Sequence, residues 1–213
     1  MIGLLQNGQY EVFVLLIIAL TLSLSFHEFG HAIVAKWQGD DTAERAGRLT
    51  INPLAHIDPM GLLMVVLVGI GYAKPVPTDP RNFKSSVSDL YIAAAGPAMN
   101  LLLALVSWNL FLLAWSAGWT SEGGQIFFTI LAQINLLLML FNLIPLGPLD
   151  GHYILPHFLS RRMANQYRVF NARYGGAVFI GLILLSFMGY IPLFGLLAQL
   201  STGMLALITL VPI

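Results

Sequence analysis

The chain has 213 residues, of which 57% are hydrophobic and only 9% are charged. Soluble domains average about 25% charged residues, so this composition excludes an ordinary soluble domain and indicates an integral membrane protein. Ten Lys and Arg balance ten Asp and Glu, which excludes the basic field that recruits nucleic acid. The chain has no Cys, so disulfides, thiolate catalysis and Cys-ligated metals are excluded as well.

Apolar stretches predict the helices of an all-α polytopic membrane protein, because a helix needs about 20 apolar residues to cross a bilayer. In chain order these stretches are 10–37, 60–72, 90–119, 124–145 and 175–213. The last is about twice as long as one span and is interrupted by Gly189, Pro192 and Gly195, which favours a hairpin of two helices. Polar loops are expected at 38–59, 73–89 and 146–174. We therefore expect about five transmembrane helices in a single domain, residues 1–213.

The positions of Lys and Arg predict how the chain is oriented in the bilayer. Segment 60–72 has 13 residues, which is short for a span, and all ten Lys and Arg lie on one side if it enters the bilayer and returns. The positive-inside rule makes that side cytoplasmic. We expect a re-entrant segment at 60–72, the N-terminus outside, the C-terminus inside, and a multi-pass protein of the cell membrane. A segment 60–72 that spans the bilayer is the alternative.

The sequence His27-Glu28-Phe29-Gly30-His31 lies within the first apolar stretch. On a helix, residues four apart share a face, so both imidazoles can bind one metal ion while Glu28 reaches a metal-bound water. Random placement of five His and four Glu gives ~0.002 matches to this pattern. The alternative is two packing histidines beside a glutamate, but three polar side chains in an apolar helix need a reason.

A catalytic zinc site needs a third protein ligand at the same depth in the membrane. The rise of a helix places His27 roughly 26 Å from Tyr10, and Asn142 lies about as far along the fourth stretch. Pro145 then ends that helix, so Asp150 falls at a matching depth. His152 is an alternative ligand.

Three further polar residues are weaker candidates. His56 either braces its loop or acts near the site, and His157 is an interfacial residue. Asn100, early in the third stretch, either bonds to a neighbouring helix or holds the substrate backbone or a developing oxyanion.

Together, His27–His31, Gly96–Asn100, Asn142–Pro145 and Leu149-Asp150-Gly151 resemble the site-2 protease family of intramembrane zinc metalloproteases. The resemblance covers a catalytic core at about 10–155 and implies a compact member without a PDZ or CBS domain. It implies one zinc ion per chain, held by His27, His31 and Asp150, with Glu28 as the catalytic acid and base. It also implies a site just below the cytoplasmic surface. The family's usual Asn-Pro is Asn142-Leu143 here, so the position of the helix break is open.

The function that follows is regulated intramembrane proteolysis. A helix shields its carbonyl groups, so a membrane-protein substrate must be locally unwound before its peptide bond is hydrolysed. The alternative is a membrane metal transporter or carrier that uses the same ligands without hydrolysis, although a carrier has no need of Glu28.

Residues 48–52 alternate polar and apolar, which is the period of a strand, and Gly47 and Pro53 flank them. We expect a small strand element at the cytoplasmic mouth of the site. It either pairs with an unwound substrate or pairs only with segment 60–72.

Overall fold

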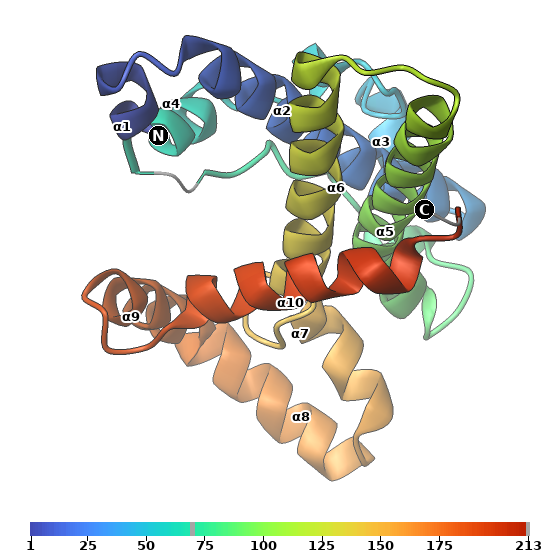
Figure 1. Cartoon of the computed structure of the whole chain (residues 1–213). Coiled ribbons are helices and arrows are strands. Elements are labelled where there is room, and N and C mark those ends of the chain that lie inside the picture. Colours follow the sequence, from blue (N-terminus) through green and yellow to red (C-terminus); the bar gives the residue numbers. More distant parts are fainter. Residues whose placement is uncertain (69–70, 212–213) are drawn as a thin grey trace.

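The computed structural model describes residues 1–68 and 71–211, and it is built almost entirely of helices (Figure 1). Among the described residues, four helical stretches are long and apolar enough to cross a membrane, and α10 is a shorter apolar helix. The four are α2 (Tyr10–Trp37), α5 (Ser88–Ser116), α6 (Glu122–Asn142) and the continuous stretch Arg161–Phe187. The prediction of an all-α polytopic membrane protein is confirmed.

Short helices connect and extend these long ones. They are α1 (Ile2–Gln6), α3 (Thr42–Arg45), α4 (Pro59–Val68), α7 (Gly151–Ile154), α8 (Arg161–Phe170), α9 (Gly176–Phe187) and α10 (Leu193–Ile208). Three single turns of 3-10 helix lie at Pro53–Ala55, Pro80–Asn82 and Leu155–Phe158. A π turn, Asn171–Gly175, joins α8 to α9 without a break.

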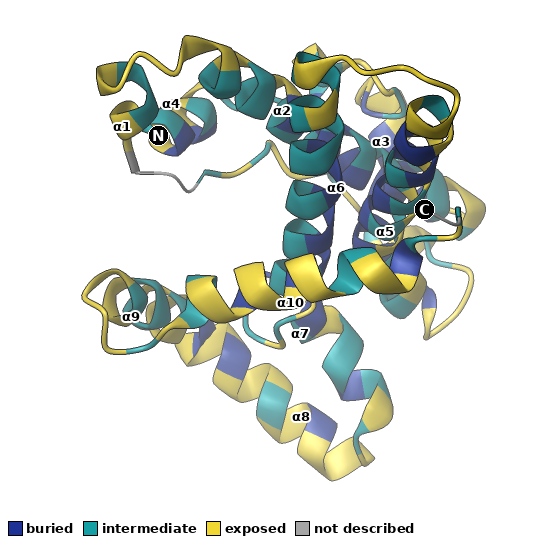
Figure 2. Ribbon diagram, viewed as in Figure 1, coloured by how far each residue is buried: buried dark blue, intermediate teal, exposed yellow. Residues whose placement is uncertain are grey.

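The core of the molecule is the packing of α2, α5 and α6 against one another (Figure 1). The backbones approach closely at Gly30, where a Cβ atom would stand 2.7 Å from the carbonyl oxygen of Ala95. Small residues at helix contacts allow this approach in a membrane, where packing and polar contacts hold helices together. The interior is accordingly polar, with Ser23, Asn100 and Asn135 fully buried. Apolar side chains such as Leu110 face outward instead, and Figure 2 shows the buried residues concentrated on these three helices.

The strand predicted at 48–52 is wrong, because this segment is irregular. A strand would bury Leu49 and Ile51 on one face, but Ile51 is 55% exposed whereas Arg48 is 5% exposed. Arg48 turns inward because its guanidinium finds backbone carbonyl groups to bond, as described below. Beside a membrane an apolar side chain can face outward, so alternation of polar and apolar residues does not predict a strand there.

Segment 60–72 forms α4 at its start, and residues 69–70 lie outside the described part of the chain. The two ends of this segment meet. Ile57 and Ala73 form an antiparallel bridge, and the amide of Lys74 donates to the carbonyl oxygen of His56 at 2.8 Å. A single crossing would separate these ends by the thickness of the bilayer, so this geometry is that of a segment that returns.

The polar region 146–174 is largely helical rather than a loop, which corrects the predicted start of the C-terminal hairpin at residue 175. Ser160 caps α8 by accepting from the amide of Met163, and α8 runs through the π turn into α9. Ala164, Asn171 and Gly175 are buried along one helical stripe. High polarity marked this region as water-facing but did not exclude a helix with a single buried stripe.

The predicted break between two C-terminal helices is present at residues 188–192, and α10 packs against α6. The ring of Phe194, at the start of α10, stacks on Phe141 at the end of α6. At the other end of α10, the amide of Asn109 donates to the carbonyl oxygen of Ile208 at 2.7 Å. Asn109 is in the half of α5 nearer Ser116, so α10 runs from the end of α6 to this half of α5. Residues 212–213 lie outside the description.

Candidate metal centre

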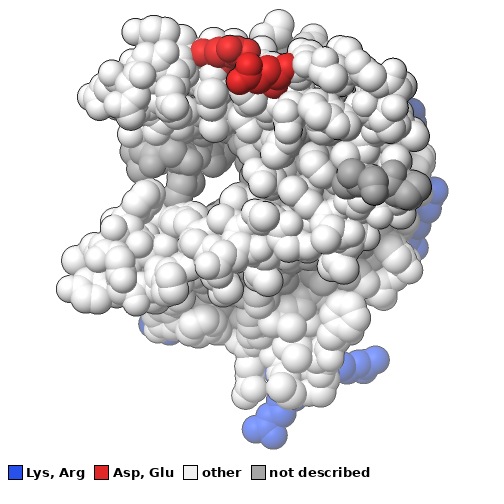
Figure 3. Space-filling view, in the orientation of Figure 1, with Lys and Arg blue, Asp and Glu red and all other residues white. Residues whose placement is uncertain are grey.

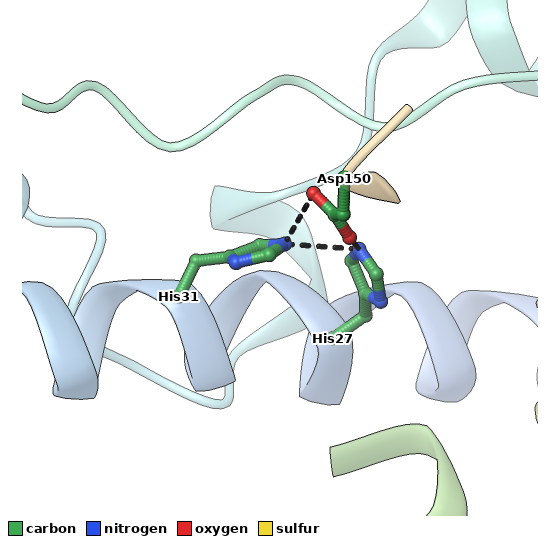
Figure 4. A group of neighbouring side chains, drawn as sticks. All are labelled: His27, His31 and Asp150. Carbon is green, nitrogen blue, oxygen red and sulfur yellow. Dashed lines mark hydrogen bonds and ion pairs between the residues drawn. The ribbon is translucent and has the colours of Figure 1, made fainter. Parts of the chain in front are cut away.

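Three side chains from distant parts of the chain converge between α2 and the start of α7 (Figure 4). The Nε2 atoms of His27 and His31 lie 3.0 Å apart. Asp150 places Oδ2 3.3 Å from the first of these atoms and Oδ1 3.4 Å from the second. Two ligands of one zinc ion, each about 2.0–2.1 Å from it in a tetrahedron, stand ~3.3 Å apart. The spacing of the three side chains therefore fits a zinc ion.

Hydrogen bonds behind the two rings determine which nitrogen carries the proton. His31 Nδ1 lies 2.7 Å from the carbonyl oxygen of Ile92, which can only accept, so Nδ1 is protonated. His27 Nδ1 lies 2.7 Å from Oδ1 of Asn100, with the same consequence. Both Nε2 atoms then present lone pairs to each other and to the Asp150 carboxylate, whose Oδ2 is buried without a hydrogen-bond partner. Three electron-pair donors that face one another call for a cation.

The turn that carries Asp150 follows α6, which ends at Asn142, three residues before Pro145. Gly151 lets this turn fold tightly, because a Cβ atom there would stand 2.4 Å from the carbonyl oxygen of Leu143. The C-terminal region also holds the turn, since the amide of Gly147 donates to Oδ1 of Asn171 at 2.9 Å. Contacts on both sides thus fix the position of the carboxylate.

Glu28 is buried on α2, one residue from His27. Its Oε2 accepts a hydrogen bond of 3.0 Å from the backbone amide of Val76. Val76 belongs to segment 73–79, which is irregular apart from the bridge at Ala73, so this segment passes beside Glu28. The bond fixes the orientation of the carboxylate of Glu28, which directly follows His27 on α2.

Arg48 and His56 hold segment 73–79 in place. The guanidinium of Arg48 donates to the carbonyl oxygen of Pro75 at 3.1 Å and also to that of Lys74. Arg48 Nη2 donates to Nδ1 of His56 at 3.3 Å, and Nε2 of the same ring donates to the carbonyl oxygen of Thr50 at 2.7 Å. His56 thus braces the loop, which agrees with one of the two roles expected for it.

Asn100 faces the protein interior rather than the space around the metal centre. Its Nδ2 donates to the carbonyl oxygen of Ser23 at 3.2 Å and to Oδ1 of Asn135 at 2.8 Å, which uses both amide hydrogens. This arrangement supports the first of its two expected roles, a bond to neighbouring helices.

The remaining histidines point elsewhere. His152 lies with Nδ1 2.9 Å from the carbonyl oxygen of Leu149 and its ring against Tyr153. His157 lies with Nε2 3.0 Å from Oδ1 of Asp89, at the start of α5. Neither belongs to the cluster of described residues that could hold a metal ion.

Three contributors to this centre were not found from the sequence. Asn135 had a signal, since it is a polar residue in an apolar helix. Arg48 lies in a polar loop, where an arginine is common and gives no sign of a buried role. Val76 acts through its backbone, so its side chain carries no signal at all.

The fold and this cluster together define a polytopic membrane protein with a potential metal centre among its helices. The chain matches Peptidase family M50 over residues 15–123 and 114–188, and it belongs to that family. No solved structure matches the chain.

Three curated relatives include the words zinc metalloprotease in their names. YwhC of Bacillus subtilis is 43% identical over 66% of this chain and 67% of its own length. Rip2 of Mycolicibacterium smegmatis is 36% identical over 68% of this chain and 58% of its own length. A protein of Methanocaldococcus jannaschii is 27% identical over 76% of this chain and 39% of its own length. The matches thus span about two thirds or less of these relatives. Family and names indicate an intramembrane zinc metalloprotease and offer no support for a metal carrier.

Proposed function

We propose that this chain hydrolyses peptide bonds in or near transmembrane segments of membrane proteins, with His27, His31 and Asp150 as the ligands of one zinc ion and Glu28 as the acid and base. The observation that carries the proposal is the convergence of two imidazole lone pairs and a carboxylate beside a buried glutamate. Burying ionisable side chains in a membrane costs free energy, so such residues are candidates for a functional role.

The chemistry divides between the metal and Glu28. Bound zinc supplies Lewis acidity, which eases the ionisation of water and polarises a carbonyl group. Glu28 takes a proton from the attacking water as its oxygen adds to the scissile carbonyl carbon. The same carboxyl group then gives the proton to the leaving nitrogen as the C–N bond breaks. The hydrogen bond from Val76 holds Glu28 in place for both transfers.

The substrate is a membrane helix that unwinds locally, since an intact helix shields its carbonyl groups. A cavity of about 440 Å³ beside the turn that carries Asp150 supports this. Gly147, Pro148 and His152 line the cavity together with Phe179 and Ile180 of α9. The lining of this cavity is mostly apolar, which suits an apolar segment bound beside the turn.

The active site faces the cytoplasmic side of the cell membrane in this proposal. Acidic residues gather at one end of the visible surface, and the Lys and Arg in view lie away from it (Figure 3). Because the chain has no native Cys, single cysteines can test the orientation. We expect cysteines at Asp41 and Ser85 to react only from the cytoplasmic side, and one at Ser121 only from outside. Reaction of Asp41 and Ser85 from opposite sides would mean that segment 60–72 spans.

The activity itself is tested with purified protein and peptides that correspond to membrane segments. We expect mass spectrometry to find cleavage products, and a zinc chelator to abolish them, with activity restored by added zinc. Products that persist at full yield in the chelator would contradict the proposed function.

A further inference from the structure

A chain of hydrogen bonds crosses the three core helices and ends on His27. It starts on α6, where Nδ2 of Asn135 donates to the carbonyl oxygen of Leu131 and to Oγ of Ser23, both at 2.8 Å. It continues on α5, where Nδ2 of Asn100 donates to Oδ1 of Asn135 at 2.8 Å. It ends on α2, where Oδ1 of Asn100 accepts from Nδ1 of His27 at 2.7 Å.

Backbone carbonyl groups fix the direction of every bond in this chain. Leu131 offers a carbonyl oxygen, which only accepts, so the nitrogen of Asn135 must face it and the oxygen must face Asn100. Ser23 offers a second carbonyl oxygen, which fixes Asn100 in the same way. The Ser23 hydroxyl donates to the carbonyl oxygen of Ala19 at 2.7 Å and is therefore the acceptor for Asn135. The only ring nitrogen left for a proton on His27 is Nδ1.

The two histidines differ in how this state is imposed. His31 bonds to the backbone of Ile92, a partner that no substitution removes. His27 depends on the side chains of Asn100 and Asn135, which are both 0% exposed. Within a membrane little water is available to replace a lost partner, so a break at Asn135 would leave Asn100 held in this orientation by the longer bond to the carbonyl oxygen of Ser23 alone. Rotation of Asn100 would present an N–H group to Nδ1 and shift the proton of His27 to Nε2.

We propose that Asn135 is a positioning residue for the metal centre. It acts through Asn100 to keep the proton of His27 on Nδ1, and so keeps the Nε2 lone pair available to the metal ion. The proposal rests on His27 being a zinc ligand, as proposed above. Loss of such an outer partner typically weakens metal binding about 10–100-fold.

The test compares Asn135→Leu with a matched control, Asn109→Leu. Leucine has the same branched skeleton as asparagine with larger terminal groups, so any effect of the added volume is common to both variants. Asn109 is also a buried asparagine of the core, but its amide bonds to Ile208 and Leu210 at the end of α10, away from His27. Zinc affinity is measured in detergent by competition with a coloured chelator. We expect Asn135→Leu to bind zinc about 10–100-fold more weakly than wild type, and Asn109→Leu within about threefold of it.

Equal zinc affinity in Asn135→Leu and wild type would overturn the positioning role, as would equal weakening in both variants. If wild type itself does not bind zinc, or His27→Ala binds it as tightly, the metal site fails and this inference fails with it. A second measurement does not require the Asn135 variant to fold. It records ¹⁵N NMR spectra of metal-free wild type labelled in histidine. The His27 signals are assigned by their loss in His27→Ala. We expect a proton on Nδ1 of His27, and a proton on Nε2 would overturn the proposal.

Discussion

The core of α2, α5 and α6 differs from the C-terminal region of α8 to α10 in the kind of residue that each region buries. Of the nine buried residues of α2, five are Ser, His or Glu. No residue of α9 is buried, and α10 buries Leu197, Ser201 and Ile208. The core therefore encloses polar groups that must be paired, whereas the C-terminal region turns apolar residues such as Ile180 and Leu207 outward. Figure 2 shows that α9 and α10 have few buried residues.

The difference shows where this chain tolerates change. A buried polar group is held by its partners and is costly to leave unpaired, whereas an outward apolar residue needs only an apolar neighbour, protein or lipid. We therefore expect substitutions in the core to change the chemistry, and most substitutions on the outward faces of α9 and α10 to have little effect.

The sharpest contrast is between two Gly→Ala substitutions. A Cβ atom at Gly96 would stand 2.3 Å from Nε2 of His31 and 2.6 Å from Cε1 of His27, whereas one at Gly181 in α9 meets nothing within 4 Å. A displacement of about 1 Å at a reacting group costs roughly 100-fold in rate. We expect Gly96→Ala to lose about that much cleavage activity together with most of its zinc, measured on purified protein. Gly181→Ala should keep both and gain up to about 1 kcal/mol in helix stability. Similar zinc contents in the two variants would contradict the expected difference between the core and the C-terminal region.

The next largest effect concerns the support of Glu28. Arg48→Met keeps the length of the side chain but removes the donors to segment 73–79. The carbonyl groups of Lys74 and Pro75 then lose their donor, at about 0.5–1.5 kcal/mol per bond, and Val76 is no longer held against Glu28. We expect cleavage to fall roughly 10-fold with zinc content unchanged, because Arg48 contacts none of the three proposed ligands. Arg45→Met, at an exposed arginine of the same loop, is the control and should behave as wild type. Loss of zinc from Arg48→Met would show that the contact does more than orient Glu28.

A smaller effect is expected where the two regions meet. Asn171 is buried and accepts from the amide of Gly147, three residues before Asp150. Asn171→Ala leaves that amide without its partner, so the turn carrying Asp150 should loosen. We expect kcat/KM to fall several-fold, by less than about 10-fold, with Asn165→Ala on the exposed side of α8 as the control. A loss as large as that in Gly96→Ala would mean that the C-terminal region is part of the chemical machinery.

The sequence identified the parts of this centre that have side-chain chemistry and a fixed spacing. His27, Glu28 and His31 are joined by the period of one helix, and Asp150 was found because helix rise measures depth. The structure brings His27, His31 and Asp150 together as that reasoning predicted, while their roles as ligands stay a proposal. Asn135 could have been found by the same logic, because an asparagine in an apolar helix needs a partner.

The remaining features were out of reach for physical reasons. Val76 contributes a backbone amide, which every residue except proline possesses. The path of α10 depends on Trp108 and Asn109, which bond to its C-terminal end, and nothing in an apolar stretch reveals which way it crosses its neighbours. Outward apolar faces carry no partner-specific pattern, so the region 146–213 was predicted less well than the core.

The central claim is that Glu28 performs proton transfer beside a zinc ion that it does not hold. Glu28→Gln keeps the size of the side chain and its hydrogen-bond acceptor for Val76 but removes the base. Zinc content and cleavage of a membrane-segment peptide should be measured on the same preparation of this variant. We predict about one zinc ion per chain, as in wild type, and cleavage reduced by about 100- to 10,000-fold. Cleavage near the wild-type rate with full zinc content would contradict the account.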